Sequence, residues 1–558
     1  MRRVLKIVLP LIGKSGFLKY VILGILSGLF SFLFINAVNR VIGLLIAGRF
    51  TSIQKEYIIA FASIILLFIW IRRTLAVAII NLSQKLFWTL RKEILSTVLK
   101  ASFQQLSAKR VKIHSAILSD VHILTDASMN IITFATSLVL AIACLGYLAS
   151  LSMVLFVITL AISLMGVSIY HFSTRKNNQQ FEASRSLENE FIDNFNAILD
   201  GFKEIYMEPK KGRYIYDKKI DAISKEAYYN NTTAFTGFLN NQITGQVLFY
   251  VLISSVLLFF SIILKIPVNN TVSFIFTLLY LLGSIETVMV LLPSLMRARI
   301  ASNHLMDLQK ELAEEEYEVQ GLSQQVKRDA FESIAIKDLE YHYSATKTSF
   351  GIGPVNFQVN KGDTVFIYGG NGSGKTTFIH NMLGLITPSD GQILLNNVPV
   401  TSERYASYRA VFSVVFSDFY LFNELIGIDH FNEDRWAYYL NLFEMEHKVK
   451  IENKCFSTTD LSTGQRKRLA LIAALMEEKP VLVIDEWAAD QDPYFREKFY
   501  TKIIPLLKAE GLTIIAITHD DKYYYCADKL YKMDYGKLIK EEVDIEEVKV
   551  VSRNSDLI

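Results

Sequence analysis

The 558-residue chain has little cysteine, little net charge and few charged residues. Its three cysteines, Cys144, Cys455 and Cys526, lie far apart and form no C-x-x-C pair. This spacing argues against both a disulfide framework and a zinc site. The net charge of +3 is too small to indicate nucleic-acid binding. We therefore expect no nucleic-acid partner and ordinary packing roles for the three thiols.

Charged residues make up 20% of the chain, whereas hydrophobic residues make up 51%, and the mean hydropathy is +0.28. This balance favours a membrane protein, and the length favours two or more domains over a single core. Six apolar runs are long enough to cross a hydrocarbon core about 30 Å thick at about 1.5 Å per residue. They predict membrane spans at residues 17–47, 55–80, 127–149, 153–172, 241–264 and 271–296.

The connections after the second and fourth spans are long and rich in Lys and Arg, and the other connections are short. This asymmetry predicts that both termini and the two long loops lie in the cytoplasm. Apolar residues at helical spacing in these loops predict that the spans continue as helices beyond the bilayer. An acidic linker is expected at residues 311–330. After it, short β-rich runs alternate with helical ones, as in an α/β domain.

A glycine-rich segment, G-G-N-G-S-G-K-T-T, follows the predicted strand V-F-I-Y and precedes a helix-compatible run, which is the context of a phosphate-binding P-loop. Glycines let backbone N–H groups approach phosphate oxygens. Lys375 is placed to reach the β and γ phosphates, and Thr376 to ligate Mg²⁺. The predicted ATP-binding residues are Gly369, Gly370, Asn371, Gly372, Ser373, Gly374, Lys375, Thr376 and Thr377. The fold class is thus an all-α six-helix transmembrane domain, residues 1–310, followed by an α/β P-loop ATPase domain, residues 331–558.

Two further segments contain candidate catalytic and binding groups. The apolar run V-L-V-I-D-E ends in Asp485, a candidate Mg²⁺ ligand, and Glu486, a candidate general base for the attacking water. Without other motifs, D-E at a strand end would indicate a solvated turn, but the preceding P-loop favours catalysis. The segment L-S-T-G-Q-R-K-R-L-A-L has Ser462, Gly464 and Gln465 at the start of a basic helix, where an anion can bind.

Together with I-T-H-D downstream, these motifs resemble the nucleotide-binding domain of ABC transporters, and the whole chain resembles an ABC exporter half-transporter. The resemblance implies ATP and Mg²⁺ as cofactors. It also implies a second half-transporter subunit, as a homodimer or with a similar half, because the L-S-T-G-Q segment of one subunit closes on ATP held by the other. By the same resemblance His519 contacts the γ-phosphate, Asp492 is the D-loop aspartate, and Tyr343, with Tyr341 as the competing choice, stacks on adenine.

The stretch V-V-F-S-D-F-Y-L-F, residues 414–422, occupies the place of the Q-loop, where the family usually has a glutamine. Ser417 stands there, with Asp418 next to it. Serine is too short to span the same distance directly. Either a water bridges Ser417 to the reaction centre, or Asp418 takes over as a catalytic and Mg²⁺-binding group.

Three phrases, L-S-T-G-Q-R-K-R-L-A-L, D-E-W-A-A-D-Q-D-P-Y-F-R and T-H-D-D-K-Y-Y, resemble the branch of ABC exporters that moves cyclic peptides and siderophore precursors. The resemblance implies ATP-driven export of a small peptide or siderophore-like cargo across a bacterial cytoplasmic (inner) membrane, in contact with membrane lipids. A lipid or multidrug exporter is the alternative within transport. An ATP-gated channel or sensor is the alternative of another class.

Charged residues inside predicted spans are costly and suggest function. Arg72 and Arg73 in the second span and Glu286 in the sixth lie at the same expected depth, roughly 22 Å from the outer ends of their spans. We hypothesise that Glu286 and an arginine line one cavity and contact polar parts of the cargo. The alternative is that the arginines extend to the headgroups and Glu286 packs against another helix.

Overall fold

The computed structural model describes residues 14–46, 55–313, 330–343, 351–401, 404–428 and 430–542. Two compact units are present. The first, the membrane unit, comprises Met1–Leu99 and Leu106–Glu314; the second, the nucleotide-binding unit, comprises Lys100–Gln105 and Glu315–Ile558. The predicted acidic linker lies outside the described residues except for 311–313 and 330.

The membrane unit is helical. Its helices are α2 (Lys14–Ile46), α3 (Lys55–Lys100), α4 (Phe103–Ser115), η1 (Ala116–Asp120), α5 (Val121–Leu151), α6 (Met153–Asp200), α7 (Phe202–Met207), α8 (Pro209–Tyr214), η2 (Ile215–Ile220), α9 (Asp221–Ser255), η3 (Val256–Phe260), α10 (Ser261–Ile263) and α11 (Val268–Ala313). The last residue of α3 and the first three residues of α4, up to Gln105, belong to the nucleotide-binding unit. Among the described residues, five helical stretches are long and apolar enough to cross a membrane, and they overlap five of the six predicted spans. The fourth prediction coincides with the shorter apolar stretch Met153–Ile169 at the start of α6.

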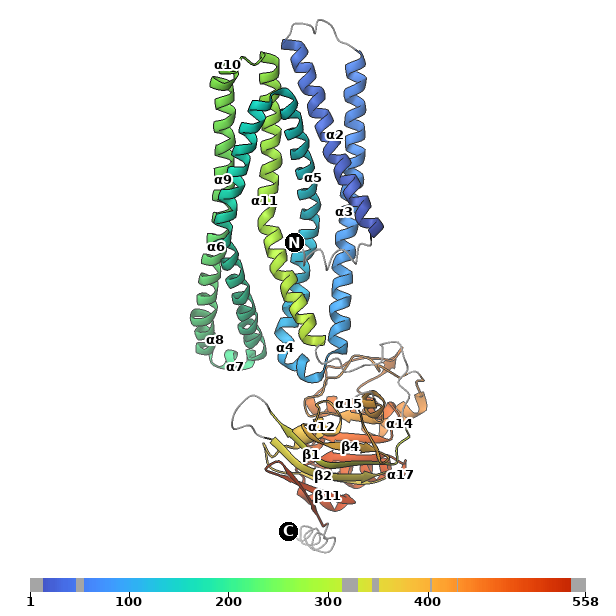
Figure 1. The fold of residues 1–558 in the computed structure, drawn as a ribbon. Coiled ribbons are helices and arrows are strands. Elements are labelled where there is room, and N and C mark those ends of the chain that lie inside the picture. Colours follow the sequence, from blue (N-terminus) through green and yellow to red (C-terminus); the bar gives the residue numbers. More distant parts are fainter. Residues whose placement is uncertain are drawn as a thin grey trace. The chain divides into compact units, whose positions relative to one another are not determined.

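The long helices pack in pairs, with α6 along α9 and both α11 and α2 along α5 (Figure 1). A buried apolar cluster holds α5, α9 and α11 together and includes Cys144, Leu148, Phe249, Phe274 and Leu278. Many large apolar side chains on the same helices point outward and are exposed in the isolated chain. Such an outward apolar surface suits a helix bundle surrounded by lipid, where backbone groups are satisfied within each helix.

The nucleotide-binding unit is an α/β structure with two main sheets. Its strands are β1 (Ser333–His342), β2 (Gly351–Asn360), β3 (Thr364–Tyr368), β4 (Asp390–Leu395), β5 (Val398–Pro399), β6 (Phe412–Val415), β7 (Ile451–Glu452), β8 (Cys455–Phe456), β9 (Val481–Asp485), β10 (Thr513–Ile517), β11 (Lys529–Asp534) and β12 (Lys537–Glu541). The helices include α12 (Lys375–Met382), α13 (Tyr405–Arg409), α14 (Glu433–Leu442), α15 (Thr463–Met476), α16 (Pro493–Lys498) and α17 (Ile504–Ala509).

The six-stranded sheet has the order β12-β11-β3-β10-β9-β6 and is parallel except for the pair β11–β12. The smaller antiparallel sheet has the order β2-β1-β4-β5. Strands β3, β9 and β10 are buried almost throughout, as expected for parallel strands covered on both faces. Ile517 at the end of β10 pairs with Ile367 on one side and with Asp485 on the other. The loops that follow these three strands therefore meet at one edge of the sheet.

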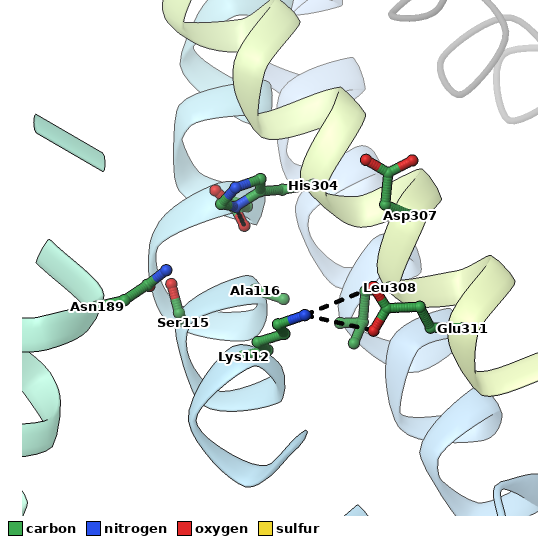
Figure 2. Close-up of a pocket in the computed structure, with 9 residues that line it drawn as sticks. Lys112, Ser115, Ala116, Asn189, His304, Asp307, Leu308 and Glu311 are labelled. Atoms are coloured by element: carbon green, nitrogen blue, oxygen red, sulfur yellow. Dashed lines mark hydrogen bonds and ion pairs between the residues drawn. The ribbon is translucent and has the colours of Figure 1, made fainter. Parts of the chain in front are cut away.

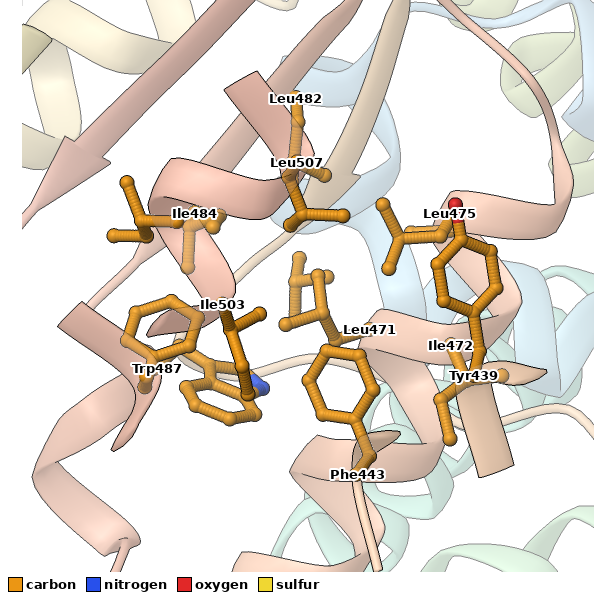
Figure 3. Close-up of a cluster of buried hydrophobic side chains, with 14 of the residues drawn as sticks. Tyr439, Phe443, Leu471, Ile472, Leu475, Leu482, Ile484, Trp487, Ile503 and Leu507 are labelled. Atoms are coloured by element: carbon orange, nitrogen blue, oxygen red, sulfur yellow. The ribbon is translucent and has the colours of Figure 1, made fainter. Parts of the chain in front are cut away.

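One apolar core lies between β9, α14, α15 and the helices after β9 (Figure 3). Trp487, Phe443, Leu471 and Ile503 are its central side chains, and each is at most 1% exposed. The Trp487 ring packs against the ring of Phe499 at a centroid distance of 4.4 Å. This core fixes the chain directly after Asp485 and Glu486, so it fixes where those two carboxylates lie.

Candidate functional site

The loop after β3 has a backbone that requires glycine. Gly372 and Gly374 have φ values of +76° and +109°, in the left-handed region. A Cβ on Gly369 would lie 2.2 Å from the backbone oxygen of Met533. Lys375 is 7% exposed, and its Nζ donates to the carbonyl oxygens of Gly369 at 2.9 Å and Gly370 at 3.1 Å. An ammonium group at the N-terminus of α12, next to a glycine-rich loop, fits a bound phosphate.

Asp485 ends β9 beside this loop and is 4% exposed. Burial raises the pKa of its carboxyl group, and the Ser417 hydroxyl partly opposes that shift by donating to Oδ2 at 3.0 Å. Ser417 therefore reaches the predicted Mg²⁺ ligand directly, without a bridging group. Asp418 is exposed, and its charge acts on the nearby imidazole of His380. Oxygen ligands from Thr376 and Asp485 are of the type that Mg²⁺ prefers, so the residues present fit that ion.

Glu486 adopts a left-handed backbone conformation with φ +47°, which is rare for a residue with a side chain. Its Oε1 lies 3.0 Å from Nε2 of His519 and 4.0 Å from Nζ of Lys375. The Nζ of Lys467 donates to the Glu486 carbonyl oxygen at 2.9 Å and holds this turn in place. The three predicted groups, from the ends of three different strands, thus converge beside a cleft of about 240 Å³ that Glu486 and His519 line.

The L-S-T-G-Q segment begins α15 with a capping box. The Ser462 hydroxyl accepts from the Gln465 backbone N–H, and the Ser462 N–H donates to the Gln465 side chain. Gly464 lies so close to Asp490 that a Cβ there would be 2.7 Å from the Asp490 carbonyl oxygen. Asp492 caps α16 by accepting from the Phe495 N–H at 2.9 Å.

That Phe495 N–H is the main reason that the pKa of the Asp492 carboxyl group is lowered. An ion pair with Arg468 at 3.0 Å adds to the effect. Asp492 thus has a capping role within this chain. The predicted contact of the L-S-T-G-Q residues and Asp492 with ATP held by another subunit remains a prediction.

Two tyrosines compete for the adenine-stacking role. Tyr341 is 8% exposed, and its hydroxyl accepts from the Gln104 amide at 2.7 Å. Tyr343 is 45% exposed, and its hydroxyl lies 3.2 Å from the hydroxyl of Thr377 on the P-loop helix. Since a stacking ring needs an open face, the geometry favours Tyr343, and Tyr341 acts as its support at a ring distance of 5.0 Å.

His380 on α12 is a residue that the sequence did not single out. Its ring lies 5.2 Å from the ring of Phe103 and 6.1 Å from that of Phe416, which directly precedes Ser417. Burial lowers the pKa of this imidazole, and the carboxylate of Asp485 opposes the shift. A histidine in the first turns of the helix after the P-loop, in F-I-H-N-M, was the available signal.

The charged residues of the predicted spans have different neighbours in the structure, and a shared cargo cavity for Glu286 and an arginine stays a prediction. Arg72 lines a pocket of about 300 Å³, and neither Arg73 nor Glu286 is among the residues that line it. Glu286 Oε1 instead accepts hydrogen bonds from the side-chain amides of Gln242 at 3.2 Å and Gln246 at 2.6 Å, both on α9. A half-buried carboxylate between helices is stabilised by such donors, and this contact is the one expected if Glu286 packs against another helix.

A polar pocket of about 210 Å³ lies between α4, η1, α6 and α11 of the membrane unit (Figure 2). At its rim Lys112 pairs with Glu311 at 3.4 Å. Deeper in the same region Asp120, 1% exposed, pairs with Arg185, 7% exposed, at 2.6 Å. No local pattern indicated this buried pair, because the two residues are 65 positions apart.

Comparison with known proteins agrees with this site. The sequence profile of ABC transporters matches residues 352–489. The ATP-binding protein SyrD of Pseudomonas syringae pv. syringae is 29% identical over 537 residues, 93% of each chain. The energy-coupling factor transporter ATP-binding protein EcfA of Methanocaldococcus jannaschii is 33% identical over 226 residues, covering 37% of this chain and 78% of EcfA.

Among solved structures, a bacterial Atm1-family ABC exporter with ATP bound is similar with a TM-score of 0.74. The two share 15% identity over 97% of this chain and 96% of the exporter, which shows the fold. The chain belongs to the ABC transporter family: a helical membrane unit of exporter fold precedes an ABC domain that binds ATP and couples its hydrolysis to transport.

Proposed function

We propose that this chain is one half of a dimeric exporter that moves a cyclic or modified peptide, or a siderophore precursor, out across a bacterial cytoplasmic membrane. The observation that carries the proposal is the match to SyrD along nearly the whole of both chains, because it joins the membrane unit and the ABC domain in one relative. The cargo class rests on the phrases around Ser462, Glu486 and His519. The predicted orientation places both termini in the cytoplasm.

In the proposed reaction a water molecule attacks the γ-phosphorus of ATP, and the bond from that phosphorus to the bridging oxygen breaks, which releases ADP. Glu486 orients the water and accepts its proton, and His519 steadies the Glu486 carboxylate across their 3.0 Å contact. Lys375 neutralises phosphate charge. Mg²⁺ would be held by Thr376 and Asp485, where it would neutralise the phosphate oxygens.

The coupling to transport follows from the need for two copies. Ser462, Gly464 and Gln465 of one chain would close on the ATP held by the P-loop of the other, so ATP would bring two ABC domains together. Hydrolysis would let them separate. The membrane helices would thereby switch between a conformation open to the cytoplasm and one open to the opposite side of the membrane.

The Glu486→Gln variant tests the catalytic assignment. It keeps the size of the side chain but removes the base, so phosphate release should fall roughly 10²- to 10⁴-fold, while ATP still binds and holds the dimer closed. Phosphate release and dimer crosslinking of the purified full-length protein measure the two effects. Glu446→Gln, at an exposed glutamate that contacts Asn441, is the matched control. Turnover at the wild-type rate in Glu486→Gln would refute the assignment.

Inverted membrane vesicles test the cargo class. We expect ATP-dependent accumulation of a labelled cyclic or modified peptide, and loss of that accumulation in Glu486→Gln. A labelled lipid and a hydrophobic dye are offered in parallel. Accumulation of lipid or dye without the peptide would overturn the cargo class and favour a lipid or multidrug exporter. Failure to accumulate all three, with a protein partner copurifying, would favour an ATP-gated channel or sensor.

A further inference from the structure

Two cavities adjoin each other in the membrane unit. The larger, about 510 Å³, is apolar and is lined by side chains such as Phe34, Ile65 and Phe68. The smaller, about 300 Å³, is polar and contains Arg72. Ser31, Leu140 and Tyr280 line both cavities, so the two form one composite cavity with an apolar and a polar end. Ligand sites of this size are mostly apolar with a few polar groups that set orientation.

Arg72 provides a positive charge at the polar end that no side chain balances. Its guanidinium lies over the ring of Phe68 at 5.6 Å from the centroid. In the part of the chain that the structure describes, no carboxylate pairs with Arg72, and no acidic residue lines either cavity. A guanidinium within an apolar helix is costly without a partner. The Arg72 guanidinium therefore favours an anionic group on the ligand. A carboxylate, with two oxygens, matches the forked geometry of the guanidinium.

The hydroxyl groups around Arg72 offer mainly acceptors. Ser31, Thr136, Ser284 and Thr287 each donate their single proton to a backbone carbonyl of their own helix, at 2.8–3.0 Å. Each oxygen then retains lone pairs that can accept a hydrogen bond. A ligand that satisfies these four oxygens must therefore carry N–H or O–H donors beside its anionic group. Amide groups of a peptide supply such donors, whereas a fully ionised alkyl phosphate has none.

We propose that the composite cavity binds an acylated peptide: the acyl group fills the apolar end, amide N–H groups donate to the hydroxyl oxygens, and a carboxylate pairs with Arg72. The inference rests on the proposed peptide export and narrows its cargo to acylated peptides with a free carboxylate. Arg72 is the specificity-determining residue.

Direct binding to the full-length protein in nanodiscs without ATP tests the site. The probes are N-decanoyl-Gly-Gly-Gly as the free acid, the same compound as its C-terminal amide, and decyl phosphate. We expect the acid to bind roughly 10- to 100-fold more tightly than the amide, and more tightly than decyl phosphate. Each methylene removed from the acyl group should weaken binding roughly fourfold.

Two pairs of variants locate the effect. Arg72→Gln should abolish the preference for the acid. Arg297→Gln, which removes a guanidinium that lies at the same 5.6 Å from a phenylalanine ring elsewhere, should keep it. Gly283→Leu should block binding by filling the polar end, where a Cβ meets no atom within 4 Å. Gly146→Leu is the matched control, since a Cβ there also has open space and Gly146 lines neither cavity.

The possible results separate this inference from the proposed function. An unchanged ratio of acid to amide binding in Arg72→Gln overturns the site even if vesicles accumulate peptides. Equal binding of decyl phosphate and the acid overturns the peptide assignment and makes the cavity a site for lipid-like anions. Failure of vesicles to accumulate any peptide, with Arg72-dependent binding retained, overturns peptide export but leaves the binding site.

Discussion

The hydrogen bond between Trp487 and α15 should stabilise the nucleotide-binding unit by an amount that can be worked out from the structure. Trp487 is 1% exposed, and its indole Nε1 donates to the Lys467 carbonyl oxygen at 2.7 Å. Lys467 in turn holds the Glu486 carbonyl through its Nζ. Trp487→Phe removes ring atoms and this hydrogen bond. Trp436, which is 4% exposed, makes no indole hydrogen bond within the described residues. Trp436→Phe therefore removes the same ring atoms and no hydrogen bond.

Both variants lose the same packed atoms. The difference between their free energies of unfolding therefore measures the hydrogen bond, at about 1–2 kcal/mol. For a domain of this size that difference corresponds to a midpoint roughly 2–8 °C lower for Trp487→Phe than for Trp436→Phe. Thermal unfolding of the full-length protein in detergent measures it, and the transition that ATP moves upward identifies the nucleotide-binding unit. Trp487→Phe should also lower the rate of ATP hydrolysis, since the Glu486 turn loosens. Equal midpoints for the two variants would refute the reasoning.

Four further outcomes are expected. Ser417→Ala should raise the pKa of the Asp485 carboxyl group further, because the charged form loses a donor, so the acid limb of the ATPase pH profile should move to higher pH; an unmoved limb contradicts the contact. Asp418→Ala should reduce cargo stimulation of the ATPase more than ATP binding, and unchanged stimulation would exclude a coupling role. Arg185→Met should cost about 3–5 kcal/mol by removing the nearer partner of the buried Asp120 and leaving only His304 at 3.8 Å, and Arg185→Met with Asp120→Leu should regain most of it in thermal unfolding. In protein without nucleotide, the raised pKa of Asp485 means that the folded state binds more protons than the unfolded state between the ordinary and raised values, so this contribution to stability falls as pH rises through that window. Asp485→Asn should remove that slope, and an equal slope in the variant contradicts the assignment.

Local patterns were enough to predict the fold class. Apolar runs of membrane length predicted the helices of the membrane unit, since a helix that satisfies its own backbone is readable from one segment. The glycine pattern from Gly369 to Gly374 and the D-E pair after β9 predicted a P-loop ATPase, because each motif carries its chemistry within a few residues. The boundaries of the two domains and the roles of the individual site residues remain predictions.

The tertiary structure decided the contacts between distant segments. Parallel pairing of β10 with β3 and β9 brings His519 within 3.0 Å of Glu486, and the short side chain of Ser417 reaches Asp485 only because β6 pairs beside β9. The same kind of information gave Glu286 its partners Gln242 and Gln246 on α9, which the sequence did not predict.

The sequence of single segments therefore determined the fold class and the candidate catalytic and binding residues. Which groups face each other depended on strand order and helix packing. Those are set by the burial of many apolar side chains at once, and no single segment encodes them.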